Sequence, residues 1–272
     1  MRIVSFNVNS VRQRLPHLAE VVAQHDPDVI GLQETKVADE SFPHDELASL
    51  GYHVVFHGQK THYGVALLSK ASPRRVYKGF VDDDADAQRR WIGVEIAAPD
   101  GVPLTVYNGY FPQGDNRAHP TKFPAKAAFY ARVLQYLTDT HSPNDAVVVM
   151  GDFNVAPGDS DIGLGEDNAK RWLRTGKASF LPEERSWFDA LLAWGLVDTY
   201  RVVHPNADAV YSWFDYRSRG FEREPKRGLR IDLILATAAL AARTSDAGSD
   251  YAVRAMAKPS DHCPVWSHWH DR

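Results

Sequence analysis

Short apolar runs that end in polar residues recur along this chain. The clearest run is Val147–Met150, which contains three β-branched residues and is followed by Gly151, Asp152 and Asn154. Such a run indicates a strand that is buried on both faces. Because residues i and i+2 of an extended chain share a face, we expect Asp152 and Asn154 side by side at the end of this strand. A plain turn is the alternative, since Asp, Asn, Pro and Gly all favour turns.

The same pattern predicts strands and helices elsewhere in the chain. Strands are expected at residues 3–8, 28–36, 52–57, 63–69, 91–97, 102–110 and 231–235, and after His262. Apolar residues at helical spacing predict helices at 15–25, 122–140 and 183–194. Residues 158–182 are rich in Asp, Gly, Lys and Arg, and we expect a long polar connection there. Loops of that length are usually functional or mobile.

Composition places the chain in an ordinary class of folded proteins. Its 272 residues fit one large domain or two small ones, and 44% are hydrophobic and 24% charged. The sequence has no run of about 18 apolar residues, so we expect no membrane partner. The start, Met1–Phe6, passes directly into a strand pattern without a secretory leader. The single cysteine, Cys263, excludes an internal disulfide, and we expect a reducing, cytoplasmic setting.

The distribution of charge changes what the net charge suggests. A formal charge of −4 argues against a polyanionic partner, because nucleic-acid-binding domains are usually basic. Positive charge is nevertheless concentrated within 170–177, and the stretch Trp213–Phe221 interleaves aromatic rings with arginines. Such a surface suits stacking on bases or sugars and pairing with phosphates. The alternative is a solvated loop whose rings pack on the core.

The polar residues at the strand ends indicate a type of chemistry. They are Asn7, Glu34, Tyr110, Asp152, Asn154, Asp232, Asp261 and His262. The sequence has no Ser or Cys nucleophile pattern and no Gly-rich nucleotide loop. Carboxylate and amide oxygens are hard ligands, so the implied metal is Mg²⁺ or a close relative such as Mn²⁺. With a histidine and a basic aromatic surface, this set favours metal-assisted hydrolysis of a phosphate ester.

Eight sequence blocks carry a resemblance to a known family. Four of these blocks occur in an order and at separations similar to those of the family's signature, and they extend over essentially the whole chain: Phe6–Asn9, Leu32–Lys36, Gly151–Asn154 and Ser260–His262. These resemble the endonuclease/exonuclease/phosphatase superfamily. Four further blocks are more specific: Asn108–Gly114, Lys122–Lys126, Arg171–Lys177 and Ser212–Ser218. They resemble the DNA-repair members of that superfamily that act at apurinic/apyrimidinic (AP) sites.

Two positions depart from the pattern of that family. Ser10 stands where the family commonly has glycine, and the segment Glu222–Lys226 is longer than expected. Neither is a presumed catalytic position. The longer segment puts the details of the DNA-contacting loop in question.

The resemblance implies a fold, an activity and a partner. The fold would be an α/β domain over residues 1–272, a four-layered α/β sandwich in which two mixed β-sheets pack face to face with helices outside. The activity would be Mg²⁺-dependent hydrolysis of phosphodiesters 5′ to abasic sites, with 3′→5′ exonuclease and 3′-phosphatase activity in base excision repair. The partner would be double-stranded DNA with abasic sites or blocked 3′ ends. A monomer in the cytoplasm, associated with the nucleoid, is expected.

Residue-by-residue matching also assigns roles at the metal and the phosphate. Glu34 would bind the metal, with Asn7 and Asp261 nearby. Asp152 would activate the attacking water, and Asn154 would hold the scissile phosphate. The remaining expected contacts are His262 as hydrogen-bond donor to the phosphoryl oxygen, Asp232 as its orienting partner, Tyr110 at the phosphate or leaving oxygen, and Gln113, Arg171, Arg174, Trp213 and Arg217 as substrate-binding residues.

Several alternatives stay open at the level of sequence. Asp152 and His262 compete for the role of general base, because either can take a proton from water. The number of metal ions cannot be read from the sequence. The same superfamily contains phosphodiesterases that act on inositol phosphates or sphingomyelin, although the basic stretches favour an extended polyanion. A binding module without activity would be expected to have lost some of the polar strand-end residues, and all are present.

Overall fold

Two six-stranded β-sheets pack face to face in the computed structural model, which describes residues 1–270. The first sheet has the order β11 (Thr244–Ser249), β12 (Val265–Trp269), β1 (Arg2–Asn7), β2 (Val29–Gln33), β4 (Val65–Ser69) and β3 (His53–His57). The second has the order β5 (Arg75–Lys78), β6 (Trp91–Ala97), β7 (Pro103–Tyr110), β8 (Val147–Asp152), β10 (Asp232–Thr237) and β9 (Leu196–Asp198). Each sheet contains both parallel and antiparallel pairs, as predicted.

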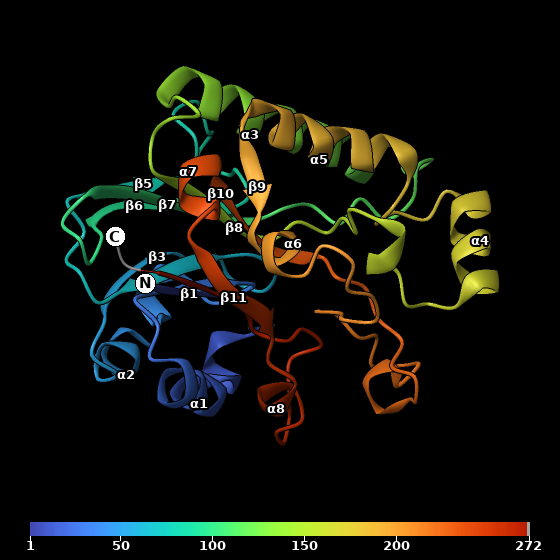
Figure 1. The fold of residues 1–272 in the computed structure, drawn as a ribbon, viewed down its shortest axis with the longest axis horizontal. Coiled ribbons are helices and arrows are strands. Elements are labelled where there is room, and N and C mark those ends of the chain that lie inside the picture. Colours follow the sequence, from blue (N-terminus) through green and yellow to red (C-terminus); the bar gives the residue numbers. More distant parts are fainter. Residues whose placement is uncertain (271–272) are drawn as a thin grey trace.

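Helices form the two outer layers (Figure 1). Helices α3 (Lys122–Thr140) and α5 (Pro182–Trp194) cover the outer face of the second sheet. Helices α1 (Leu15–His25), α2 (His44–Ala48) and α8 (Tyr251–Arg254) lie outside the first sheet. The predicted four-layered α/β sandwich is therefore confirmed. No helix within residues 1–270 combines the length and apolar character that a membrane crossing requires.

The two sheets share one pattern of strand pairing. In the first sheet, β1 is parallel to β2 and antiparallel to β12, and β4 and β3 continue antiparallel beyond β2. In the second sheet, β8 takes the place of β1, with β7 parallel on one side and β10 antiparallel on the other. Strands β6 and β5 then continue antiparallel beyond β7. This agreement shows that the two sheets are built as two similar halves, with β1 and β8 in corresponding positions.

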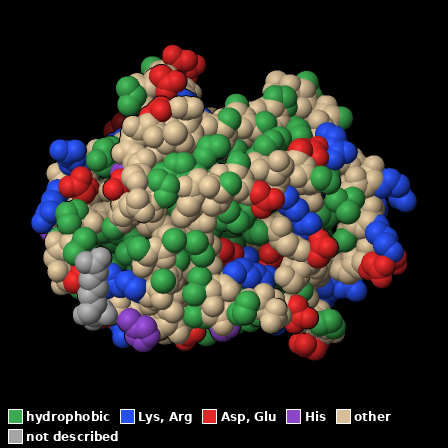
Figure 2. Space-filling view, turned by 45° about the horizontal axis from the view of Figure 1, so that its top comes forward, with side chains coloured by type: hydrophobic (Ala, Val, Ile, Leu, Met, Phe, Trp, Pro, Cys, Tyr) green, Lys and Arg blue, Asp and Glu red, His purple; other side chains and the backbone are tan. Residues whose placement is uncertain are grey.

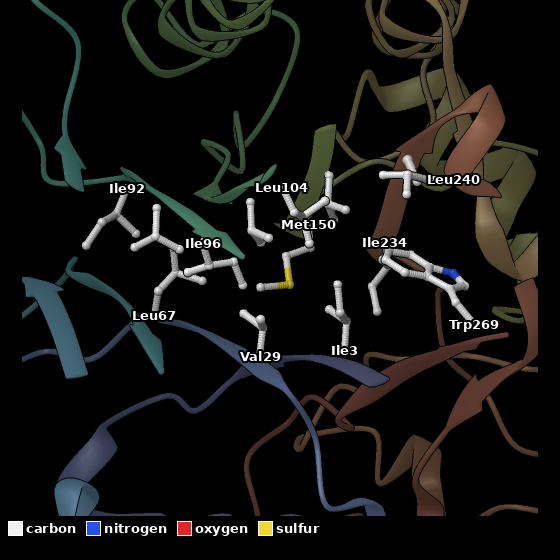
Figure 3. Close-up of a cluster of buried hydrophobic side chains, with 14 of the residues drawn as sticks. Ile3, Val29, Leu67, Ile92, Ile96, Leu104, Met150, Ile234, Leu240 and Trp269 are labelled. Carbon is white, nitrogen blue, oxygen red and sulfur yellow. The ribbon is translucent and has the colours of Figure 1, made fainter. Parts of the chain in front are cut away.

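Strands β1 and β8 are buried on both faces because they lie between a sheet and a helix layer. Ile3 of β1 points between the sheets, whereas Val4 and Phe6 face the helices. In β8, Val148 and Met150 point between the sheets and Val147 and Val149 face α3 and α5. This period-two alternation explains why the run is apolar at every position. Figure 3 shows the resulting core, with Ile3 and Val29 opposite Met150 and Ile234.

The predicted polar connection at 158–182 is wrong in one respect, because it contains helix α4 (Glu166–Thr175). The helix escapes a hydrophobic-pattern search because Trp172 is its single fully buried residue. Its ends carry ordinary signals, with Glu166 and Asp167 in the first turn and Gly176 in a left-handed C-terminal position. The sequence also gave no sign of the short elements β5, β9, β11, α2, α6 (Thr199–Val203), α7 (Ala238–Ala241) and α8.

Candidate active site

Strand direction gathers the polar strand ends at one edge of the two sheets. The parallel pairs β1–β2 and β7–β8 end there at their carboxyl termini. Strands β10 and β12 run antiparallel to these neighbours, so their first residues lie at the same edge. Asp232 at the start of β10 is thus directly opposite Asp152 at the end of β8. Of the eight residues expected together, each lies at this edge.

The amide of Asn7 links the two sheets at the floor of the site. Its Nδ2 donates to Glu34 Oε1 at 3.0 Å and to Asp152 Oδ2 at 2.9 Å. Asn7 and Glu34 come from the first sheet, whereas Asp152 comes from the second. Asn7 is fully buried, so its two hydrogen bonds fix the relative orientation of both carboxylates.

Glu34, Asp152 and His262 lie close enough together to hold a metal ion, with His262 as a ligand only if its imidazole is neutral. One ligand atom from each lies within 4.8 Å of the other two. Two carboxylates provide the hard oxygen ligands that Mg²⁺ and Mn²⁺ prefer, and a partly exposed Glu34 leaves room for water ligands. Asp261 is not in this group. Its carboxylate instead accepts hydrogen bonds from Asn9 Nδ2 at 2.8 Å and Trp213 Nε1 at 3.1 Å.

His262 is held between two carboxylates in a buried position. Its Nδ1 lies 2.8 Å from Asp232 Oδ2, and its Nε2 lies 3.8 Å from Asp152 Oδ2. Burial alone would lower the pKa of His262, but Asp232 and Asp152 outweigh burial and raise that pKa above its ordinary value. Burial, together with Asp232 and Glu34, raises the pKa of Asp152. A protonated imidazole beside a carboxylate is the arrangement that these charges favour.

Asn154 follows Asp152 in a left-handed backbone conformation, with φ of 53°. Its backbone N–H donates to Asp152 Oδ1 at 2.9 Å, and its side-chain Nδ2 donates to the carbonyl of Phe111 at 2.9 Å. Asp152 is the last residue of β8 and Asn154 lies beside it in the bend that follows, so the two are neighbours as predicted. The bend agrees with the turn interpretation, and the functional interpretation stays a prediction. Asn tolerates a positive φ better than most residues, which explains its use here.

A pocket of about 650 Å³ opens above this floor. Its walls include several expected substrate-binding residues: Gln113, Arg171, Trp213 and Arg217. Arg174 does not line the pocket and lies exposed on α4. Figure 2 shows Lys and Arg side chains gathered at the right-hand end of the molecule, where Figure 1 places α4. The basic surface expected from the sequence therefore borders the site.

Tyr110 reaches the pocket from the end of β7. Burial, with further contributions from Glu34 and Asp152, raises the pKa of its phenol well above the ordinary value. The hydroxyl consequently stays protonated and can donate a hydrogen bond. The guanidinium of Arg90 lies between two rings, 4.5 Å from the centre of Tyr110 and 4.4 Å from that of Tyr63. This stack fixes the plane of the Tyr110 ring.

Trp213 and the following loop form the wall nearest His262. Trp213 is partly buried and lines the pocket, whereas the neighbouring Phe214 is fully buried. The longer segment Glu222–Lys226 folds back onto this loop. The Nε of Arg223 donates to the carbonyl of Ser218, and the ammonium of Lys226 lies 4.2 Å from the Phe221 ring centre. Arg223 also lines the pocket, so the longer segment adds positive charge there.

Sequence reasoning assigned no role to Asn9 or Lys36, which lie beside the carboxylates. The ammonium of Lys36 lies 2.8 Å from Glu34 Oε2 and donates to Asn9 Oδ1 at 2.5 Å. Strand alternation could not have identified them, because Glu34, Lys36 and Asn9 follow the ends of β2 and β1 with positive φ angles. Lys36 supplies local positive charge to a carboxylate that otherwise faces Asp152.

The fold and this site together define a hydrolase of phosphate esters. Carboxylates and a charged imidazole lie at the floor of a pocket whose walls carry arginines and an aromatic ring. The chain belongs to the endonuclease/exonuclease/phosphatase family, whose model matches residues 4–262. This membership confirms the family resemblance found in the sequence.

Similar proteins narrow the class further. The chain is 53% identical to the exodeoxyribonuclease III of Haemophilus influenzae over 267 residues, covering 98% of this chain and 99% of that protein. A Neisseria 3′ phosphatase solved with a product DNA hairpin has a similar structure, with a TM-score of 0.89, 36% identity and complete coverage of both chains. An AP endonuclease from Archaeoglobus fulgidus also has a TM-score of 0.89, with 35% identity and complete coverage of both.

Proposed function

We propose that this chain is a DNA repair nuclease of the exodeoxyribonuclease III type. It cleaves duplex DNA 5′ to abasic sites, degrades 3′ ends and removes blocking groups from them, and it acts as a monomer with Mg²⁺. The observation that carries this proposal is the position of Glu34, Asp152 and His262 beneath a pocket bordered by arginines. The relatives that share the fold are named as nucleases, AP endonucleases and a 3′ phosphatase.

Each residue at the floor has a distinct role in the proposed reaction. Glu34 holds the metal, with Asn7 orienting its carboxylate and Asp261 in the surroundings. A metal held there would supply charge neutralisation at the phosphate and activation of water. Asp152 accepts the proton of the attacking water, and its carboxylate is oriented by a hydrogen bond from Asn7 Nδ2 at 2.9 Å, with His262 Nε2 3.8 Å away.

Three further residues stabilise the phosphate as negative charge builds. His262, kept cationic by Asp232, donates a hydrogen bond from Nε2 to a phosphoryl oxygen. A cationic ring stabilises the developing negative charge better than a neutral ring would. Asn154 holds the scissile phosphate from the left-handed turn after β8. The protonated hydroxyl of Tyr110 donates to the phosphate or the leaving oxygen. This division leaves Asp152, and not His262, as the general base.

The walls of the pocket account for the choice of substrate. Arg171 and Arg217 line the pocket and meet phosphates of the DNA backbone, and Arg174 adds charge on the exposed side of α4. Gln113 and Trp213 flank the space above the floor. Turning an abasic nucleotide out of the duplex costs less than the few kcal/mol that a stacked nucleotide requires. Trp213 would leave room for a bare deoxyribose while excluding a base.

A comparison of duplex substrates tests this proposal. The protein is incubated with Mg²⁺ and three duplexes that carry an abasic analogue, a blunt end or a 3′-phosphate. We expect cleavage of all three, with rates that rank the activities. A small phosphate ester, such as an inositol phosphate, serves as the alternative substrate. Hydrolysis of that ester without cleavage of any duplex would overturn the proposal.

A further inference from the structure

A charged pair is buried directly behind the floor of the site. Lys126, in the second turn of α3, and Glu184, in the first turn of α5, are both completely inaccessible to solvent. The ammonium of Lys126 donates to Glu184 Oε1 at 2.5 Å, to the carbonyl of Asn154 at 2.8 Å and to the carbonyl of Gln113 at 3.3 Å. An ammonium has three hydrogens, and each of them therefore has an acceptor.

Glu184 extends this contact to a third segment. Its second oxygen, Oε2, accepts hydrogen bonds from the backbone N–H groups of Ser179 and Leu181, both at 2.8 Å. The pair thus connects the turn after β8, the turn after β7 and the chain that returns from α4. Asn154, Gln113 and Ser179, one from each segment, all line the pocket. No other pair of buried charges among residues 1–270 holds the backbone of two proposed phosphate- or substrate-contacting residues.

Stability alone does not explain a charged pair at this position. Burying two charges away from water costs free energy, and a protein in which well-packed apolar residues replace such a pair is often equally or more stable. The backbone of Asn154, by contrast, has a left-handed conformation that Asn tolerates but does not impose on the chain. The carbonyl of this residue is one that the ammonium holds.

We propose that Lys126 is a positioning residue for the phosphate-binding turn and that Glu184 is its counter-ion. The inference rests on the proposed function, because only a substrate that contacts Asn154 and Gln113 makes the positions of these residues important. Lys126 touches neither the DNA nor the metal. Its ammonium fixes the direction of two backbone carbonyls, and hence the side chains that these residues present to the substrate.

Two variants separate positioning from stability. Lys126→Met removes the ammonium and leaves Glu184 as an unpaired buried charge, so the melting temperature should fall sharply. Lys126→Met with Glu184→Gln removes both charges, while the Gln oxygen still accepts from Ser179 and Leu181. We expect this double variant to regain most of the lost melting temperature. Its kcat on the abasic duplex should stay low, by about 10²-fold for a displacement near 1 Å, with a smaller change in KM.

A destabilised control calibrates the comparison. Leu137 is fully buried on the same helix, roughly 16 Å from Lys126 at 1.5 Å per residue, and Leu137→Ala should lower the melting temperature without changing kcat. All rates are measured well below the melting transitions. Recovery of kcat together with the melting temperature in the double variant would overturn the inference.

Different results would contradict this inference and the proposed function. If the unaltered protein cleaves no duplex, the proposed function fails. The positioning role is then decided by a crystal structure of the double variant. Displacement of Asn154 from its left-handed conformation supports the role, and retention of a φ near 53° contradicts it.

Discussion

Replacing Asp152 with Asn tests the chemical role of this residue while hardly changing its shape. Asp152 is 1% exposed, and burial raises its pKa, with Asp232 and Glu34 adding to the shift. His262 opposes this shift, but burial and the two carboxylates outweigh it, so the ionised form of Asp152 is unfavourable in the folded protein. Removing its charge therefore relieves a cost in the folded protein at the same time as it removes the proposed proton acceptor.

The effects on stability and on rate should differ widely. Asp152 accepts from Asn7 Nδ2 at 2.9 Å and from the N–H of Asn154 at 2.9 Å, and an amide can accept only one of these bonds. Leaving one donor unsatisfied costs about 1–3 kcal/mol. Burial, Asp232 and Glu34 together outweigh the attraction of His262 and raise the pKa of Asp152, so removing the charge offsets part of this cost. The melting temperature should therefore change little, while loss of a general base lowers kcat by about 10² to 10⁴, or roughly 3–5 kcal/mol in the barrier.

Three measurements on one preparation decide the outcome. Thermal melting reports stability, fluorescence anisotropy with a labelled abasic duplex in chelator reports affinity, and single-turnover cleavage in Mg²⁺ reports the chemical step. We expect the first two to stay close to those of the unaltered protein and the third to collapse. A variant that binds DNA weakly but cleaves it at the normal single-turnover rate would show that Asp152 serves binding and does not act as the base.

The remaining predictions concern the metal, the basic surface and the pocket wall. Chelator should abolish cleavage, and Glu34→Gln should raise the Mg²⁺ concentration for half-maximal rate in a metal titration; full activity in excess chelator would contradict the metal site. Replacing Arg171 and Arg174 with Ala should flatten the dependence of log K on log salt by about 1.8, or 0.9 for each phosphate contact. An unchanged slope in anisotropy titrations would place DNA on another surface. Trp213→Ala should narrow the ratio of abasic to intact-duplex cleavage with little change in melting temperature. A large loss of melting temperature with the ratio preserved would assign Trp213 to the core.

Much of the fold could be predicted because its strands are strongly apolar. The apolar run Val147–Met150 predicts a buried strand without any other information, and the structure confirms this strand as part of β8. Helix α4 could not be found in this way, because a helix that buries one residue has almost no apolar stripe. Ser10 has a φ of 96°, a conformation that suits glycine, which agrees with the glycine that the family resemblance implies there.

The identity of the site residues could be predicted from the sequence more readily than the contacts among their side chains. Polar residues at strand ends are visible one by one, and strand direction then brings them together. Whether Asp261 turns toward the metal group or toward Trp213 depends on side-chain contacts that no spacing encodes. The buried Lys126 was equally hidden, because a lysine in the second turn of a helix gives no sign that its ammonium points inward.

The pairing of β1 with β12 has a consequence for the newly made protein. Ile3 and Ser5 are translated some 260 residues before their partners Ser267 and Val265. The first sheet therefore cannot be completed before β12 has been translated, and His262 is itself made only just before that strand. A partial chain would lack the imidazole that the proposed reaction needs. The proposed nuclease activity would thus be absent from incomplete chains until the whole domain has been translated and has folded.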